Sequence, residues 1–179
     1  MDYASRKMDT KLSIEQIQLA IYNTPFLVNK RSDIVCPNLS WSMLPYEADM
    51  VIINKSGFMT EIEIKRSYED LKADFNKKHH HDDERVYYFY YCLPISIKDK
   101  AITFLKQKYE GKSFIDSPAL LFYDENGSIV EQNFGWKENR CKGVKFRKLF
   151  IEEQLQIARL AQMRFWNLLN KINPITHEL

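Results

Sequence analysis

The chain has little cysteine and little glycine, and both shortages exclude certain classes of fold and of binding site. Its 179 residues include only three cysteines, Cys36, Cys92 and Cys141, and none of them forms a Cys-x-x-Cys pair. This spacing argues against a disulfide framework and a zinc ribbon, and indicates reduced thiols in a cytoplasmic protein. With five glycines and six prolines the chain is not fibrous or of low complexity. The sequence also lacks a Gly-rich phosphate loop, a Gly-x-Ser-x-Gly elbow and a His-Glu-x-x-His helix.

Long apolar runs are missing as well. No stretch approaches the ~18 consecutive apolar residues that a membrane-spanning helix needs, so we expect no membrane association. The first residues, MDYASRKMDTK, contain no apolar segment of the kind that a signal peptide requires. The formal net charge is only +2, which permits nucleic-acid binding through a local patch but does not demand it.

Hydrophobic residues make up 45% of the chain and aromatic residues 13%, enough for one packed core. We therefore expect a single domain over residues 1–179. A core over 13–95 is followed by a helix, a β-hairpin and a C-terminal helix, 96–179, that pack on it. The predicted fold class is α/β, with a mixed central sheet flanked by helices.

Local signals predict the elements of this domain. Ser13 and Gln16 form a capping box that starts the first helix, which Pro25 closes, and Ser67 caps a second helix in the same way. Pro37 is expected to end the first strand. The predicted strands span 32–37, 47–54, 58–65 and 85–94, with a hairpin over 119–134 turning at Asn126-Gly127, and further helices span 97–109 and 145–172.

Acidic residues gather on the two adjacent strands of the EADMVIINKSGFMTEIEIK stretch. Because side chains alternate along a strand, Glu61, Glu63 and Lys65 share one face. If the connecting loop has three or five residues centred on Ser56, Asp49 lies directly opposite Glu63. Two carboxylates roughly 5 Å apart across a ladder repel each other, and a divalent cation removes that penalty. An even loop length would separate the two acids.

This arrangement predicts a Mg²⁺ (or Mn²⁺) site. Asp49, Glu63 and the backbone carbonyl of Ile64 supply oxygen ligands, which Mg²⁺ prefers. Lys65 is expected to orient or deprotonate the attacking water and to steady charge on a phosphate. The alternative is an ordinary strand with its charges in water. Val51 and Ile53 argue against it, because they share the face of Asp49 and indicate that protein covers that face.

The same residues resemble the PD-(D/E)XK nuclease superfamily. An acid early in one strand, a short hairpin and Glu-x-Lys in the next strand fit the superfamily's pattern, within the α-β-β-β-α-β order of its core. The resemblance implies a restriction-endonuclease-like core with Asp49, Glu63 and Lys65 as the catalytic residues. Ala48 stands where the superfamily's name has proline. Over roughly residues 33–95 the wording is also similar to MmcB-type DNA-repair proteins and related phage-borne proteins.

Four further residues are candidates for the site. Many superfamily members carry a glutamate on the first helix, which Glu15 matches; an exposed first-turn acid is the alternative. Glu47 is either an outer metal ligand or a partner of Lys65. Glu61 is expected to support the site or face water rather than bind the metal. Ser67 is expected to cap its helix; the alternative is a hydroxyl close to the site that touches a phosphate.

Basic residues near the predicted site offer phosphate contacts, with a normal solvated surface as the alternative. They are Arg66, Lys72, Lys77, Lys78, Lys145 and Arg147. The adjacent histidines His79–His81 are expected to form an exposed loop, because three consecutive side chains do not easily aim at one ion. We leave their role open.

The sequence therefore predicts a Mg²⁺-dependent endonuclease of PD-(D/E)XK type. It would hydrolyse phosphodiester bonds of DNA in repair, recombination or the processing of phage and mobile-element DNA. The alternative is a DNA-binding accessory protein that uses the same fold without cleavage. The apolar positions of the last helix are expected to pack on the domain, and a homodimer seam is the other interpretation.

Overall fold

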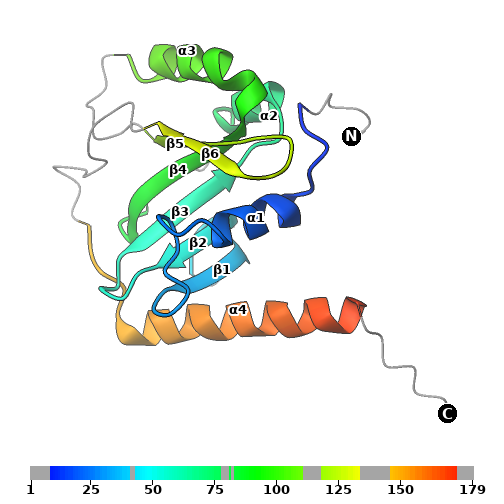
Figure 1. Cartoon of the computed structure of the whole chain (residues 1–179). Coiled ribbons are helices and arrows are strands. Elements are labelled where there is room, and N and C mark those ends of the chain that lie inside the picture. The colour runs from blue at the N-terminus through cyan, green and yellow to red at the C-terminus, as the bar shows by residue number, and fades with distance from the viewer. Residues whose placement is uncertain are drawn as a thin grey trace.

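The computed structural model describes residues 9–40, 43–77, 81, 83–110, 118–133 and 146–172. These residues form a mixed α/β fold in the predicted order of elements, with one added turn of 3-10 helix (Figure 1). The elements are α1 (Ile14–Tyr22), β1 (Ile34–Leu39), β2 (Ala48–Ile53), β3 (Met59–Ile64), α2 (Tyr68–Asp74), β4 (Val86–Pro94), η1 (Ile95–Ile97), α3 (Lys98–Lys108), β5 (Ala119–Tyr123), β6 (Ile129–Asn133) and α4 (Ile151–Ile172).

The six strands form one mixed sheet in the order β1-β2-β3-β4-β5-β6. The first three are an antiparallel meander, β3–β4 and β4–β5 are parallel pairs, and β6 returns antiparallel to β5. The parallel pairs occur where a helix joins the strands, α2 before β4 and α3 before β5, because a parallel connection needs a crossover. The two helices therefore lie where the parallel strand pairs need crossover connections.

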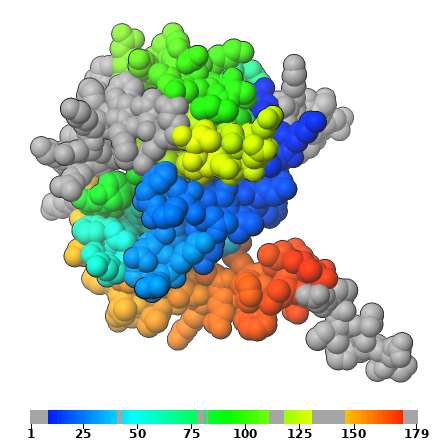
Figure 2. All heavy atoms as spheres, viewed as in Figure 1, coloured from blue at the N-terminus to red at the C-terminus, as the bar shows by residue number. Residues whose placement is uncertain are grey.

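Helix α1 covers one face of the sheet. Ser13 accepts a hydrogen bond from the backbone N–H of Gln16, and the Gln16 side chain accepts one from the Ser13 N–H, which is the predicted capping box. Ile17 and Ile21 are fully buried against the side chains of β2 and β3 that point to this face, among them Ile62. In the view of Figure 2, α1 and the segment after it form much of the visible surface, with α4 along one edge.

The opposite face carries two separate apolar clusters. Under α4, the fully buried Ile157 packs with Val51 and Met59. Under α2 and α3, the buried Leu71 packs with neighbours from β4 and β5. Phe89 of β4 borders both clusters. Glu61 and Glu63 point to this face between them, since they alternate with Ile62 along β3.

Three sequence predictions are wrong in detail. Pro37 does not end β1, which continues to Leu39; β1 lies at the edge of the sheet, where a residue without an N–H is tolerated. Helix α4 begins at Ile151 rather than near residue 145. The apolar positions of α4 were expected to pack on the domain, but two of them, Met163 and Leu168, are 59% and 50% exposed.

Gly57 in the turn between β2 and β3 has a φ of +81°. A Cβ atom there would also lie 3.0 Å from Nε2 of Gln154, which donates a hydrogen bond to the Leu149 carbonyl. We expect Gly57→Ala to lower the free energy of unfolding by about 2 kcal/mol, from left-handed strain plus this close approach. Urea denaturation followed by circular dichroism measures the loss.

Gly127 is the matched control, because its φ is +84° but an added Cβ would meet only Leu12 at 3.6 Å, an ordinary contact. Gly127→Ala is therefore expected to cost about 1 kcal/mol, the strain alone. Equal losses in the two variants would show that the approach of Gln154 to the β2–β3 turn has no energetic consequence.

Candidate metal and catalytic site

The turn between β2 and β3 has the odd length that the sequence argument required. Strand β2 ends at Ile53 and β3 begins at Met59, so five residues centred on Ser56 connect them. The ladder pairs Met50 with Ile62, and continuing this register by one residue sets Asp49 opposite Glu63. The predicted register is confirmed.

Asp49 lies just past the last ladder pair, and there its side chain, rather than its backbone, bonds to β3. Its Oδ2 accepts a hydrogen bond of 2.7 Å from the backbone N–H of Ile64, the residue after Glu63. Burial, and then the negative charge of Glu63, raise the pKa of Asp49 to about 6. The protein therefore holds this carboxylate in a place where its charge is disfavoured without a nearby cation.

Lys65 is buried between two carboxylates. Its Nζ donates to Glu63 Oε2 at 2.8 Å and to Asp74 Oδ1 at 2.7 Å, and its side chain is 3% exposed. Burial alone would lower the pKa of Lys65, but the charges of Glu63 and Asp74 outweigh it and raise that pKa above its usual range. Lys65 is thus a fixed cation at neutral pH.

Asp74, at the end of α2, organises the other side of the site. Burial acts to raise its pKa, but hydrogen bonds from His81 and Lys65 outweigh this and hold that pKa far below its usual range. Its Oδ2 also accepts from the Tyr91 hydroxyl at 2.7 Å. Asp74 was not among the predicted site residues. The available signal was its place beside Leu71 on the apolar face of α2, where an unpaired charge is costly.

His81 is a member of the site, and the expectation of an exposed loop is wrong for this residue. Its Nδ1 lies 2.5 Å from Glu61 Oε1 and its Nε2 lies 3.2 Å from Asp74 Oδ2. The ring stacks on Phe89 at 4.4 Å between centroids, and Tyr46 meets it edge-on. Burial acts to lower the pKa of His81, but hydrogen bonds to the two carboxylates raise it to about 9. His79 and His80 lie outside the described residues.

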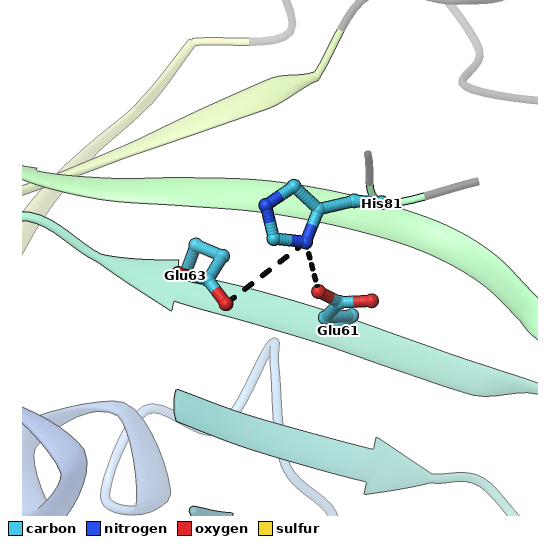
Figure 3. A group of neighbouring side chains, drawn as sticks. All are labelled: Glu61, Glu63 and His81. Atoms are coloured by element: carbon cyan, nitrogen blue, oxygen red, sulfur yellow. Dashed lines mark hydrogen bonds and ion pairs between the residues drawn. The ribbon is translucent and has the colours of Figure 1, made fainter. Parts of the chain in front are cut away.

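Glu61 is fully buried, so of the two roles expected for it, supporting the site or facing water, the second is wrong. Its Oε2 accepts a hydrogen bond of 2.8 Å from the Tyr46 hydroxyl. One ligand atom each from Glu61, Glu63 and His81 lie within 4.8 Å of one another (Figure 3). Glu63 Oε1 is buried and has no hydrogen-bond partner, which marks it as an acceptor awaiting a donor or a cation.

The remaining site candidates lie elsewhere. Glu15 is exposed on α1, which packs on the face of the sheet away from Glu63. Glu47 is exposed, and the carboxylate partners of Lys65 are Glu63 and Asp74 instead. Ser67 is buried and accepts from the Asp70 N–H as the predicted cap of α2. The reciprocal bond of a capping box is not formed, because Asp70 accepts from the Arg66 N–H.

Most of the basic candidates that the structure describes have carboxylate partners. Lys72 pairs with Glu69 on α2, and Lys77, 56% exposed, pairs with Asp74. Arg147 joins Glu84 to Glu153, at 2.8 and 2.7 Å. Lys78 and Lys145 lie outside the described residues. The Arg66 Nε is buried without a hydrogen-bond partner.

Counted together, the site has one more negative than positive group. Its carboxylates are Asp49, Glu61, Glu63 and Asp74, and its cations are Lys65, Lys77 and protonated His81. Most of these charges are buried, and a buried unpaired charge is expensive. Asp49 and His81 are only partly buried and connect the group to the surface. The arrangement is therefore suited to accept a cation from solvent.

Comparisons with known proteins leave the family of this chain open. No family model matches it, and no curated protein does. A solved structure of a protein of unknown function from Silicibacter pomeroyi is similar at 14% sequence identity and a TM-score of 0.48, covering 83% of this chain and 86% of that one. Among the residues that the structure describes, no helix has the length and apolarity to span a membrane.

Proposed function

We propose that this protein is a metal-dependent nuclease of the PD-(D/E)XK class that hydrolyses phosphodiester bonds of DNA, on a restriction-endonuclease-like core. We place it in DNA repair, recombination or the processing of mobile DNA. One observation carries the proposal: the β2–β3 register sets Asp49 opposite Glu63, with Lys65 Nζ 2.8 Å from Glu63. The order α1-β1-β2-β3-α2-β4 is compatible with it.

The residues present fit a divalent cation. Glu63 Oε1 is a buried acceptor without a partner, and Asp49 carries a charge that its surroundings disfavour. These two carboxylates and the Ile64 carbonyl would hold Mg²⁺ or Mn²⁺, both of which take oxygen ligands. When bound, such an ion polarises a phosphate oxygen and makes hydroxide available at neutral pH.

Lys65 contributes positive charge rather than a base. Its raised pKa keeps the ammonium protonated, and its bonds to Glu63 and Asp74 fix the position of Nζ. A fixed cation two residues beyond Glu63 stabilises negative charge that develops on a phosphate in the transition state. Of the two roles expected from the sequence, the electrostatic one is therefore favoured over deprotonation of water.

The test measures cleavage of linear, flapped and branched DNA in Mg²⁺ and in Mn²⁺. We expect the wild type to cut at least one substrate, chelator to stop the reaction, and Asp49→Asn to slow it at least a hundredfold, about 2.7 kcal/mol in the barrier. An asparagine oxygen still accepts from the Ile64 N–H, so the variant removes the charge while keeping the contact that Asp49 makes.

Glu125→Gln is the control, because Glu125 is an exposed carboxylate in the β5–β6 turn, outside the site. It should cleave at the wild-type rate. Cleavage by Asp49→Asn at that rate, or cleavage that persists in chelator, would contradict the proposal. Lys65→Ala should also lose activity. Its cleavage rate must be compared with its folding stability, because removing this buried cation is also expected to destabilise the protein.

A DNA-binding accessory protein is the second candidate. The observation in its favour is that Lys65 Nζ donates hydrogen bonds to two carboxylates, at 2.8 and 2.7 Å. These bonds occupy the ammonium that cleavage would use to stabilise a phosphate. Fluorescence anisotropy with labelled DNA separates the two functions. An accessory protein would bind DNA without metal, would show the same DNA affinity in the Asp49→Asn variant as in the wild type, and would release the DNA uncut. A nuclease would cut the DNA.

A further inference from the structure

We propose that Glu61, Glu63 and His81 form a binding site for a first-row transition metal, with His81 Nδ1 as its nitrogen ligand. This site does not depend on the nuclease proposal. It shares Glu63 with the Asp49 pair, but adds an imidazole and a second buried glutamate that the superfamily resemblance does not assign.

The three candidate ligand atoms already converge (Figure 3). His81 Nδ1 lies 2.5 Å from Glu61 Oε1 and 3.9 Å from Glu63 Oε1. Metal bonds of about 2.0–2.1 Å in tetrahedral geometry set neighbouring ligand atoms about 3.3 Å apart. The two observed distances lie on either side of that value, and all three ligand atoms lie within 4.8 Å of one another, so small side-chain movements would complete the site.

The second ring nitrogen of His81, Nε2, faces a carboxylate, as the second nitrogen of a metal-ligating histidine often does. Nε2 of His81 faces Asp74 Oδ2 at 3.2 Å, an arrangement that keeps a proton on Nε2 when Nδ1 releases its own proton to the solvent and becomes the ligand. Stacking on Phe89 holds the plane of the ring. Asp74 is in turn held by the Tyr91 hydroxyl and Lys65, so the support continues one layer further.

The two glutamates are oriented in the same way. Glu61 Oε2 accepts from the Tyr46 hydroxyl, which leaves Oε1 directed at His81. Glu63 Oε2 accepts from Lys65, which leaves Oε1 directed at the same point. In each of the three side chains one polar atom is anchored and the other faces the common space.

A second, independent observation points to a ligand. Glu63 is only 2% exposed, and its Oε1 is buried with no hydrogen-bond partner. A buried carboxylate oxygen without a partner costs free energy, and native proteins rarely leave one unexplained. A cation between Oε1 and His81 supplies the missing interaction.

The donor set selects the class of metal. One imidazole nitrogen with two carboxylates suits Zn²⁺, Co²⁺ or Mn²⁺, whereas Mg²⁺ and Ca²⁺ favour oxygen alone. Three protein ligands also leave at least one coordination position for water or an anion, as in catalytic rather than structural zinc sites. His81 is only partly buried, with 13% of its side chain exposed, which gives that position a route to solvent.

Cobalt titration of the chelator-treated full-length protein tests the site, because bound Co²⁺ has visible absorption bands that report coordination. We expect saturation at one ion per chain, displacement by Zn²⁺ at comparable concentration, and displacement by Mg²⁺ only at far higher concentration, since the two sites share Glu63. His81→Gln and Glu61→Gln should each weaken Co²⁺ binding at least tenfold. Absence of a Co²⁺ spectrum and of binding heat in the wild type would overturn the proposal without any variant.

Two matched controls locate the ligand. Glu125→Gln and His79→Gln make the same substitutions outside the proposed ligand set and should keep wild-type affinity. A loss in His79→Gln with none in His81→Gln would refute the assignment. Circular dichroism of each metal-free variant checks its folding, and Zn²⁺ should raise the unfolding temperature of the wild type but much less that of His81→Gln.

Asp49→Asn separates this proposal from the nuclease. It should abolish DNA cleavage and weaken Co²⁺ binding less than His81→Gln and Glu61→Gln do, because Asp49 acts on the ion only through its charge beside Glu63 and is not one of the three ligands. Metal binding without cleavage would leave this site standing and remove the nuclease. Cleavage in Mg²⁺ without Co²⁺ binding would do the reverse.

Discussion

Replacing Lys65 with methionine is expected to lower the free energy of unfolding by about 3–5 kcal/mol. The ammonium is the shared partner of Glu63 and Asp74, at 2.8 and 2.7 Å, and all three side chains are nearly fully buried. Methionine fills the space left by the lysine stem but leaves two carboxylates without their cation. The loss comes from those stranded charges rather than from the ion pairs as such.

Lys77→Met is the control that isolates burial. Lys77 also pairs with Asp74 Oδ1, at 2.6 Å, but its side chain is 56% exposed whereas that of Lys65 is 3% exposed. An exposed pair contributes at most about 1 kcal/mol, so Lys77→Met should change the urea midpoint little. Similar losses in the two variants would show that the Lys65 charge is not effectively desolvated.

A combined variant tests the mechanism. If stranded charge is the cause, adding Glu63→Gln and Asp74→Asn to Lys65→Met should recover part of the lost stability, although each change alone is destabilising. The same reasoning explains why Lys65→Ala is a poor stand-alone test of catalysis: a hundredfold loss of cleavage would mix lost chemistry with a destabilised fold.

Much of the fold could be predicted because the signals were local. The Ser13–Gln16 capping box and the Ser67 cap each fix a helix start within a few residues. Gly127, with φ of +84°, marks the β5–β6 turn as Asn-Gly predicted. Pro37 misled because a proline forbids only a central position in a sheet, and edge position is a property of the whole topology.

The strand part of the site was also accessible, since strand periodicity and turn length are local quantities. The five-residue turn centred on Ser56 was enough to set Asp49 opposite Glu63. Asp74 and His81 were not accessible in this way. They come from the end of α2 and the segment after it, and reach Glu61 and Glu63 only because α2 returns over the sheet.

His81 also illustrates the limit of reading polarity as exposure. The run HHHDDE is polar throughout, yet its third histidine stacks on Phe89 and meets two buried carboxylates. Its burial depends on the gap between the apolar cluster under α4 and the one under α2 and α3, and Phe89 borders both. The sequence around His81 therefore gives no signal that this histidine is buried.

The metal-free wild type is expected to lose stability as the pH rises from about 6.5 to about 9, by an amount on the order of 3 kcal/mol. The pKa of His81 is raised from 6.5 to about 9 in the folded protein by its bonds to Asp74 and Glu61, which outweigh burial. A raised pKa means that the folded state binds the proton more tightly. The stabilisation is therefore complete below pH 6.5 and lost as the pH rises through 9.

Other shifted groups act outside this window. The pKa of Asp49, raised from 3.8 to about 6, changes stability in the same direction but at lower pH. The lowered pKa of Asp74 adds stability above its unfolded value of 3.8, and the raised pKa of Lys65 acts only above 10.5. Burial also raises the pKa of the Cys36 and Cys92 thiols above 9.0, so these two groups begin to lower stability as the pH approaches 9. Between pH 6.5 and about 8 the slope is consequently assigned to His81.

Urea denaturation in chelator at half-unit steps from pH 6 to 9.5 measures this slope, and His81→Gln is the control. Glutamine keeps a hydrogen-bonding side chain beside Glu61 and Asp74 but does not titrate, so the stability of the variant should be nearly flat up to about pH 8 and fall only with the buried thiols above it. A wild-type curve that is equally flat would show that His81 is not held as a cation between the two carboxylates. An identical fall in His81→Gln would assign the slope to another group.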